Sequence, residues 1–429
     1  MSEVHHEHDG KIVFLYYYRR AKQDLTSLMK WLALAFLTGF TVGGISTMFS
    51  FTLATMTSYR EEHGWVFFCL PLAGLAIVYL YQHIGKEDGG TDQVFSTVRS
   101  KDEVSFRMAP LIFISTALTH LTGGSAGREG AAIQLGGSIG NQLGRCIRLD
   151  EQDRHVMVMC GMSAAFAALF GTPMAAAIFA MEVVSVGVMY YTALVPCVVA
   201  GLVATNFAAG LGIHPEVFHV TGIPKLTIVT GFKMGVIALG CAVVSVCFCV
   251  ALKETGGFFK KHFPNPYLRV VSVSLVIIAV TVALHTTDYM GAGIEIITRA
   301  IEEGETGRLT FVWKMLLTVL TMRAGFRGGE IVPSFCVGAT FGCVMGHLLN
   351  LSPSLCAAAG MAAVFCGVTN CPITSILIAF ELFGFKGVSY YLIAVSISYA
   401  ASGYYSLYRD QTIVYSKYKA KYVNRRTSI

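Results

Sequence analysis

The sequence predicts an all-α protein that crosses a membrane several times and contains two related halves. Of its 429 residues, 54% are hydrophobic and only 14% are charged, whereas soluble domains carry about 25% charged residues. Between Val156 and Leu252 the only charged residues are Glu182, Glu216, Lys225 and Lys233. Stretches with so little charge are typical of transmembrane helices, which need about 20 apolar residues each. A pattern that recurs about 200 positions later indicates the two halves.

The apolar segments follow one another along nearly the whole chain. Two of them contain an internal proline, Pro173 or Pro372, and proline interrupts a helix because it lacks the backbone N–H and clashes with the preceding turn. We therefore expect broken helices at these two places. The candidate spans lie near residues 28–57, 65–84, 108–121, 156–184, 188–212, 227–252, 268–286, 309–323, 332–350, 355–383 and 388–407.

The charge distribution predicts the orientation of the chain. Basic residues gather before the first span and near the C-terminus, and Lys and Arg beside spans favour the cytoplasmic side. The polar start of the chain does not resemble a cleavable signal peptide. We expect a cytoplasmic segment at 1–27, membrane repeats at 28–220 and 221–415, and a cytoplasmic tail at 416–429. Both termini are then inside, with an even number of crossings.

Several other classes of protein are excluded by spacing. The twelve cysteines lie mostly in apolar runs without a CxxC pair, and no HExxH helix occurs, so we expect neither a metal site nor a cofactor. The segment 123–127 matches G-x-S-x-G, but a hydrolase elbow needs a preceding strand, and nothing here is strand-patterned. We therefore expect no enzyme and, because the basic residues lie at span edges, no nucleic-acid partner.

The two halves are related by a gap-free alignment. Residues 161–182 match 360–381 at seven positions, which include Pro173 with Pro372 and Glu182 with Glu381. Residues 127–140 likewise match 329–342 through three glycines. Small-residue patterns recur in any helix bundle, but this does not explain a matching proline and glutamate. Repeated halves with interrupted helices are typical of transporters whose site lies at the repeat interface.

The segment 123–130 predicts an anion site in the first half. Arg128 and Glu129 stand between Gly127 and Gly130 in otherwise apolar sequence, directly before an expected helix at 131–143. A helix N-terminus presents unpaired N–H groups and positive partial charge, so it binds anions. The carboxylate of Glu129 would compete for these donors and would leave them when protonated. An N-cap without a transport role is the alternative, but ionisable groups at membrane depth are usually functional.

The second half contains a counterpart at 325–333. Its helix is expected to begin near Val332 or Pro333, because proline suits the first helical turn. Gly329, Ile331 and Val332 would then supply N–H donors that face the same point, with Glu330 as a second acid. Glu182 and Glu381 end apolar helices, and either hydrogen bonding inside the bundle or proton transfer remains open for them.

Taken together, these motifs resemble the CLC family of anion channels and anion/proton antiporters. The resemblance rests on GREG at 127–130, GxxGGExxP at 325–333 and the GTP and NCP turns, and it runs from about residue 30 to 420. It implies homodimers of inverted-repeat subunits with broken, tilted helices and one pathway each. It also implies that Glu129 is the gating glutamate and proton carrier.

Departures from the chloride-type pattern indicate the fluoride/proton antiporter branch. Residues 91–95 stand where chloride-type members have GSGIP. Val183 occupies the position of the internal glutamate that carries protons in chloride antiporters, and the second-half motif contains an acid, Glu330. The resemblance therefore implies fluoride export driven by protons across a prokaryotic plasma membrane. A chloride/proton antiporter or a chloride channel of the same family is the alternative.

The remaining candidates for the anion pathway are Thr91 and three aromatic residues. Ring edges are electropositive and can face a small anion, so Phe95 and Phe335 are candidates, although ordinary packing is an equal alternative. The family's central tyrosine matches Tyr415 best, at the start of an expected basic helix, with Tyr408 and Tyr404 as weaker matches.

Overall fold

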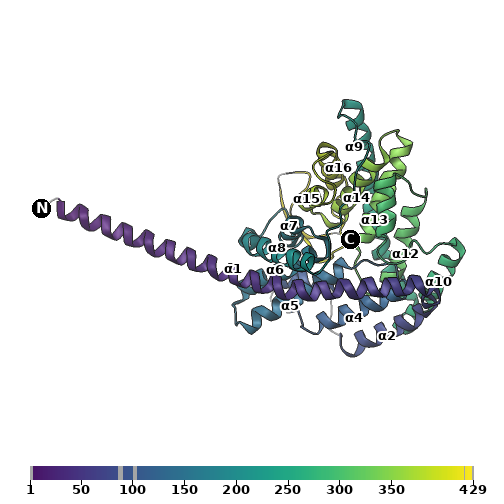
Figure 1. The fold of residues 1–429 in the computed structure, drawn as a ribbon, viewed down its shortest axis with the longest axis horizontal. Coiled ribbons are helices and arrows are strands. Elements are labelled where there is room, and N and C mark those ends of the chain that lie inside the picture. The colour runs from purple at the N-terminus through teal and green to yellow at the C-terminus, as the bar shows by residue number, and fades with distance from the viewer. Residues whose placement is uncertain (1–2, 86–89, 100–103, 420, 428–429) are drawn as a thin grey trace.

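The computed structural model describes residues 3–85, 90–99, 104–419 and 421–427 and consists almost entirely of helices (Figure 1). The N-terminal part of α1 projects from a body in which the other helices pack together. The helices are α1 (Glu3–Glu62), η1 (Gly64–Cys69), α2 (Leu70–His83), α3 (Thr91–Arg99), α4 (Met108–Leu121), α5 (Glu129–Cys146), α6 (Glu151–Phe170), α7 (Pro173–Glu182), η2 (Tyr191–Ala193), α8 (Leu194–Gly210), α9 (Ile228–His262), α10 (Pro266–Leu284), α11 (Ile294–Thr298), η3 (Arg299–Glu303), α12 (Thr310–Ala324), α13 (Ile331–Leu348), α14 (Pro353–Thr369), α15 (Pro372–Phe383) and α16 (Val388–Ala401).

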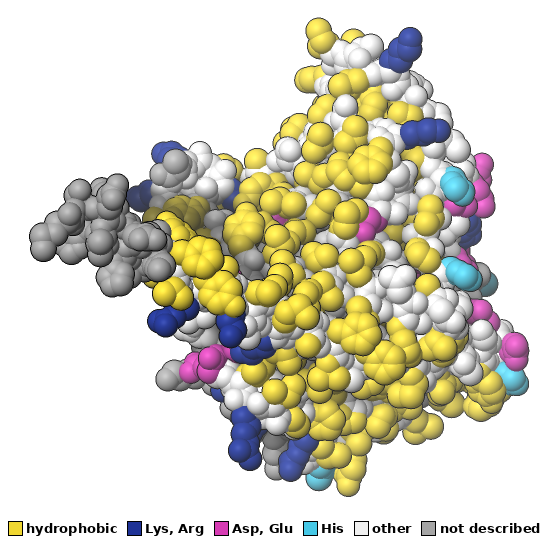
Figure 2. Space-filling view, turned by 60° about the vertical axis from the view of Figure 1, so that its left-hand side comes forward, with side chains coloured by type: hydrophobic (Ala, Val, Ile, Leu, Met, Phe, Trp, Pro, Cys, Tyr) yellow, Lys and Arg dark blue, Asp and Glu magenta, His cyan; other side chains and the backbone are white. Residues whose placement is uncertain are grey.

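The prediction of several membrane spans is confirmed. Within the described ranges, six helical segments are long and apolar enough to cross a membrane, and five shorter apolar helices accompany them. A broad face of the molecule is covered by hydrophobic side chains, while most of the charged side chains in view lie toward its margins (Figure 2). Such a surface suits a lipid environment, where apolar side chains face the hydrocarbon. The expected first span at 28–57 is part of the single 60-residue helix α1, so residue 28 marks no structural boundary.

Both predicted helix breaks are present. α6 ends at Gly171, which has a left-handed backbone (φ 69°), and α7 begins at Pro173. In the second half α14 ends at Asn370 (φ 59°) and α15 begins at Pro372. Proline is favourable at the first helical position and unfavourable further inside a helix. The same residue type therefore stops one helix and starts the next in each half.

Glycines set the packing within each half. The Gly161 backbone on α6 lies so close to α5 that a Cβ atom at Gly161 would come within 2.0 Å of the Gly136 carbonyl oxygen. In the second half a Cβ atom at Gly360 on α14 would come within 2.4 Å of the Gly338 oxygen on α13. These are the glycines that the alignment pairs. Only glycine permits such a close backbone approach. The glycines repeat in the sequence because the two helix pairs pack in the same way.

Two glutamates link the halves to each other. Glu182, at the end of α7, accepts hydrogen bonds from the Ile373 and Thr374 N–H groups at the start of α15, at 3.1 and 2.9 Å. Glu381, near the end of α15, accepts bonds from the Met174 and Ala175 N–H groups at the start of α7, at 3.0 and 2.9 Å. α7 and α15 therefore run antiparallel and cap each other, which is the arrangement expected of an inverted repeat. Carboxylates are favourable at helix N-termini.

The end of the chain differs from the prediction. Instead of a basic helix, a small three-stranded sheet joins β1 (Ser185–Val186), β2 (Thr412–Tyr415) and β3 (Tyr422–Arg426). Gln411 fixes this segment to the body because its amide donates to the carbonyl oxygens of Val183 and Thr369, at 2.8 and 2.7 Å. These partners are distant in sequence, so the local charge pattern could not reveal them. Tyr415 consequently lies on a strand.

Candidate functional site

The centre of the site is the place where α5 and α13 begin. Gly127 and Gly329 form an antiparallel bridge in which each N–H donates to the other carbonyl oxygen at 2.7 Å. A Cβ atom at Gly329 would lie 2.5 Å from the Gly130 nitrogen, so this contact requires glycine. The structure thus brings Gly127, Gly130 and Gly329 together and directs two helix N-termini to one region. Such termini carry positive partial charge.

Glu129 is the first residue of α5, and its side chain is fully buried (0% exposed). One carboxylate oxygen, Oε2, accepts a hydrogen bond from the Arg128 N–H at 3.0 Å. The other, Oε1, lies 3.4 Å from the Arg128 Nε atom. The carboxylate therefore folds back on the start of its own helix, where an anion would otherwise find the same donors.

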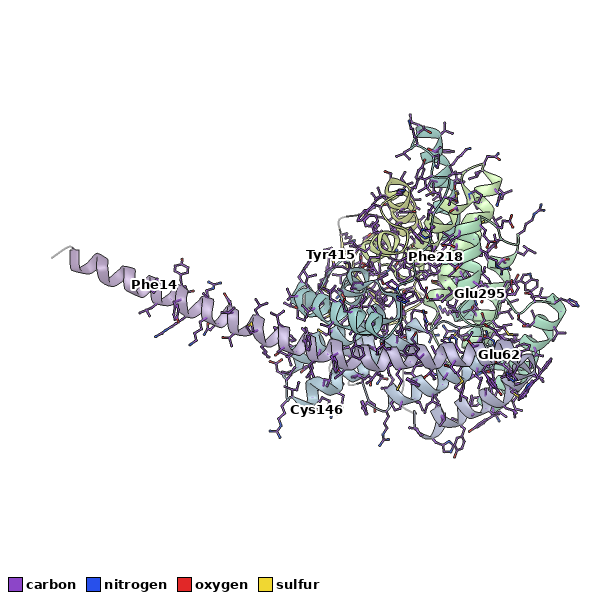
Figure 3. The ribbon with its side chains drawn as sticks, in the orientation of Figure 1. Phe14, Glu62, Cys146, Phe218, Glu295 and Tyr415 are labelled. Atoms are coloured by element: carbon purple, nitrogen blue, oxygen red, sulfur yellow. The ribbon has the colours of Figure 1, made fainter. Side chains whose placement is uncertain are left out.

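Arg128 connects Glu129 to a cavity on one side of the protein. Its guanidinium group forms a 2.6 Å ion pair with Glu216, in the segment that joins the two halves. Arg128 also lines a cavity of about 500 Å³, together with Arg60 and His120. Glu61 on α1 and Glu295 on α11 also line it, and Figure 3 labels Glu295 and Glu62 on the right-hand side of the body. We refer to this cavity as the Arg60 cavity.

The start of α13 supplies the second acid. Glu330 is the N-cap residue of this helix, and a Cβ atom at Gly130 would lie 3.7 Å from its Oε2 atom. Arg323 and Arg327 are close enough for their charges to act on Glu330. The acid therefore stands beside the start of α5, close to two arginine side chains.

The remaining α13 candidates are buried in its first two turns. Ile331 and Val332 are fully enclosed, with Val332 presenting no hydroxyl group. Phe335 packs against Phe170 and Phe365 with ring centroids 5.9 and 5.0 Å away. Phe335 therefore packs in the core, and its place in the anion pathway stays a prediction.

The aromatic pair of this region is formed by Phe95 and Tyr408. Their rings meet edge to face with centroids 4.8 Å apart, a favourable geometry for aromatic rings. Tyr408 is 3% exposed, and its hydroxyl has no hydrogen-bond partner among the described residues. The charges of Glu129, Glu330 and Asp92 all act on this hydroxyl. Tyr408 thus lies within electrostatic reach of all three acids.

Tyr415 does not complete this site. Its side chain is 49% exposed and packs against Tyr422 with centroids 5.9 Å apart. In Figure 3 it lies on the opposite side of the body from Glu62 and Glu295. The prediction for Tyr415 is wrong, because β2 leaves its side chain at the surface, whereas Tyr408, seven positions earlier, is buried. Thr91 is near the site only indirectly, since its hydroxyl accepts a hydrogen bond from the Gln134 amide on α5 at 2.8 Å.

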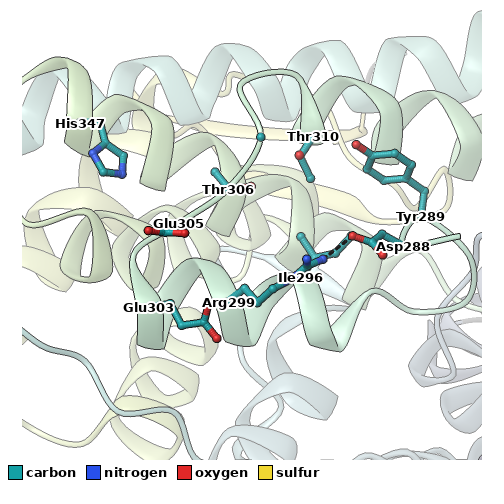
Figure 4. Close-up of a pocket in the computed structure, with 10 residues that line it drawn as sticks. Asp288, Tyr289, Ile296, Arg299, Glu303, Glu305, Thr306, Thr310 and His347 are labelled. Atoms are coloured by element: carbon teal, nitrogen blue, oxygen red, sulfur yellow. Dashed lines mark hydrogen bonds and ion pairs between the residues drawn. The ribbon is translucent and has the colours of Figure 1, made fainter. Parts of the chain in front are cut away.

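A separate pocket of about 470 Å³ is shown in Figure 4. Its charged lining contains three acids, Asp288, Glu303 and Glu305, against Arg299, which is paired with Asp288. A pocket with this excess of carboxylates repels anions. In the described part of the chain, no group of three His, Cys, Asp or Glu side chains is arranged to hold a metal ion.

The fold and the two facing helix starts define an inverted-repeat membrane transport protein. A family model described as voltage gated chloride channel matches residues 73–403. The chain belongs to this CLC family. It is 37% identical to a chloride/fluoride channel protein of Pseudomonas syringae pv. tomato, over 94% of this chain and 91% of the relative.

Solved structures agree with this assignment. A CLC-type fluoride/proton antiporter superimposes with a TM-score of 0.85 at 34% identity, covering 90% of this chain and 98% of the other. A slow cyanobacterial chloride/proton antiporter has a TM-score of 0.77 at 17% identity, covering 87% and 94%, and this likeness concerns the fold alone.

Proposed function

We propose that this protein exports fluoride in exchange for protons and so protects a bacterial cell from fluoride. The observation that carries the proposal is the position of Glu129, a fully buried carboxylate held on the start of α5 beside the start of α13. A relative at 37% identity is named a chloride/fluoride channel protein, and a structure at 34% identity is that of a fluoride/proton antiporter. Both support fluoride as the anion.

Glu129 would alternate between two states. As a carboxylate it accepts the Arg128 N–H and occupies the donors at the start of α5. When it takes a proton its attraction to those donors weakens, and it leaves them to the anion. The proton then moves with Glu129 while the anion moves through the vacated position. One carboxyl group thereby exchanges the two ions.

The surroundings of Glu129 suit a small, strongly hydrated anion. The close contacts at Gly127, Gly130 and Gly329 bring backbone groups of the two helix starts together. The edge-to-face pair of Phe95 and Tyr408 adds ring edges and one free hydroxyl group. N–H groups, a hydroxyl and electropositive ring edges can together replace the water around fluoride.

Chloride/proton exchange is the second candidate. A 27% identical relative from Vibrio cholerae, which matches 65% of this chain, is named an H(+)/Cl(-) exchange transporter. The name of the Pseudomonas relative also includes chloride. Chloride is larger and less strongly hydrated than fluoride, so the two candidates differ in the anion that the protein releases faster.

We also propose a homodimer in the inner membrane, with both termini in the cytoplasm. Each chain holds Glu129 and Glu330 from its own two halves, so each subunit would have its own pathway. The basic residues in the first part of α1 and in the C-terminal segment support the cytoplasmic placement of the termini.

An efflux assay with several anions tests the proposal. Liposomes that contain the purified protein are loaded with fluoride or chloride, and release is followed with ion-selective electrodes. Fluoride should leave far faster than chloride. Equal or faster chloride release would contradict the proposal and favour the chloride candidate.

A further inference from the structure

A proton that reaches Glu129 from the Arg60 cavity must leave on the other side of the protein. Glu129 is fully buried, and proton transfer requires titratable groups or water within hydrogen-bonding reach. Val183, which follows Glu182, offers only a backbone oxygen, and this oxygen accepts a hydrogen bond from the Gln411 amide. On this side Glu330 lies beside Gly130, the residue that follows Glu129, and the charges of Glu330 and Asp92 both act on the Tyr408 hydroxyl.

Asp92 lies in the first turn of α3, a nine-residue polar helix that is not one of the candidate spans. Its side chain is half-buried, and Oδ1 accepts a hydrogen bond from the Arg409 N–H at 3.0 Å. The charged groups that face it come from three other elements. They are Arg409 and Asp410 from the C-terminal segment, Glu330 from the start of α13, and Arg323 from α12.

The neighbours of Asp92 connect it in two directions. Arg409 lines a cavity of about 360 Å³ with Lys253, Lys260 and Thr427. We refer to this cavity as the inner cavity. In the other direction Asp92 is close enough to Glu330 for their charges to interact. Glu330 in turn lies beside Gly130, the residue that follows Glu129.

The buried hydroxyl of Tyr408 lies at the junction of this series. The charges of Glu330, Asp92 and Glu129 all reach it, and it has no partner among the described residues. A hydroxyl can both donate and accept, so it can hydrogen-bond whichever carboxyl group carries the proton. Thr427 positions the residue because its hydroxyl donates to the Tyr408 carbonyl oxygen at 2.8 Å.

We propose that Asp92 is the inner proton acceptor of the exchange cycle, which passes protons between Glu330 and the water of the inner cavity. This inference rests on the proposed fluoride/proton exchange. In the inward direction the O–H bond of protonated Glu129 breaks and one forms on Glu330. The proton then moves to Asp92 and finally to water, and each carboxyl group returns to its ionised state.

The electrostatic surroundings suit this role. Burial, followed by the charge of Asp410, raises the pKa of Asp92 from its usual value to about 6. An acid with a pKa near the working pH both accepts and releases protons readily, whereas an ordinary aspartate is almost always ionised. Its protonated fraction therefore falls as the inner pH rises through about 6.

A purely structural role for Asp92 is the competing explanation, because the side chain also holds the Arg409 backbone. Asparagine separates the two roles. The Asp92→Asn side chain keeps an oxygen that can accept the Arg409 N–H, but it cannot carry a proton. Asp92→Glu keeps a carboxyl group that can carry a proton, although the longer side chain moves this group.

The test compares Asp92→Asn, Asp92→Glu and the unchanged protein in liposomes. An outward fluoride gradient is applied, and fluoride release and proton uptake are recorded together. Asp92→Asn should release fluoride while proton uptake per fluoride falls by at least about tenfold, and Asp92→Glu should restore much of it. Asp153→Asn is the matched control, since this partly exposed acid pairs with Lys30 and lines neither of the two cavities.

Each outcome decides the question. Proton uptake in Asp92→Asn equal to that of the unchanged protein overturns the inference, and so does an equal loss of both fluxes in a folded variant. If Asp92→Asn does not purify in a folded form, the pH dependence of uptake in Asp92→Glu decides, and an unshifted profile overturns the inference. If the unchanged protein moves no protons with fluoride, the proposed function itself fails.

Discussion

Replacing the two capping glutamates should show that they join the halves and carry no protons. Glu182 is 6% exposed and accepts three hydrogen bonds from the start of α15, from the Ile373 N–H and from the N–H and hydroxyl groups of Thr374. Glu381 accepts two at the start of α7, from Met174 and Ala175. The pair offers a matched comparison, because the chemistry is the same and the burial differs.

The expected magnitudes follow from the donors that each substitution leaves unpaired. Each buried donor without a partner costs about 1–3 kcal/mol. Glu182→Ala leaves two backbone N–H groups unpaired, since the Thr374 hydroxyl can rotate to another acceptor, so the loss should be about 2–6 kcal/mol. Glu381 is half-buried, and the Met174 N–H lies near the surface where solvent can replace the carboxylate. Its loss should therefore be about 1–3 kcal/mol.

Thermal unfolding of both variants in the same detergent measures the difference, with fluoride-coupled proton uptake as the second readout. Glu182→Ala should unfold at a clearly lower temperature than Glu381→Ala. Glu182→Gln keeps one acceptor oxygen and should retain normal coupling. The reasoning would be refuted by equal destabilisation in the two alanine variants, or by lost proton uptake with intact fluoride release in Glu182→Gln.

Three further substitutions test individual parts of the site. Glu129→Gln should abolish proton coupling, because an amide cannot carry the proton, and unchanged proton uptake in liposomes would remove Glu129 from the mechanism. Gly329→Ala should destabilise the fold by about 1–3 kcal/mol, because its Cβ atom would meet the Gly130 backbone; an unaltered unfolding temperature would contradict the bridge between the halves. Tyr408→Phe should slow fluoride release while Tyr415→Phe leaves it unchanged, and the reverse order in the electrode assay would exclude Tyr408 from the pathway.

Much of the fold could be predicted because glycine and proline constrain the backbone directly. Pro173 and Pro372 stand at helix starts in both halves, and no packing arrangement can place them deep inside a helix without cost. Gly136 and Gly161 could be recognised through their counterparts in the second half. The positions of Gly127 and Gly329 opposite each other followed from the same repeat.

The C-terminal part of the site could not be predicted in this way. Tyr408 occupies an irregular segment whose position depends on Gln411 and Thr427, and their partners are far away in the sequence. No local pattern marks Asp92 as a site residue either, because its neighbours Glu330, Arg323 and Arg409 come from three separate segments. The spacing of residues along the chain predicts helices and their ends. It does not predict these contacts, which join segments that are distant in the sequence.

The most direct test of fluoride/proton exchange is whether a fluoride gradient alone drives protons uphill. Liposomes containing the protein are given outward fluoride and no initial pH difference, and the internal pH is recorded as fluoride leaves. The account predicts internal acidification that disappears in Glu129→Gln and is not reproduced by an equal chloride gradient. Fluoride release without any pH change would contradict it.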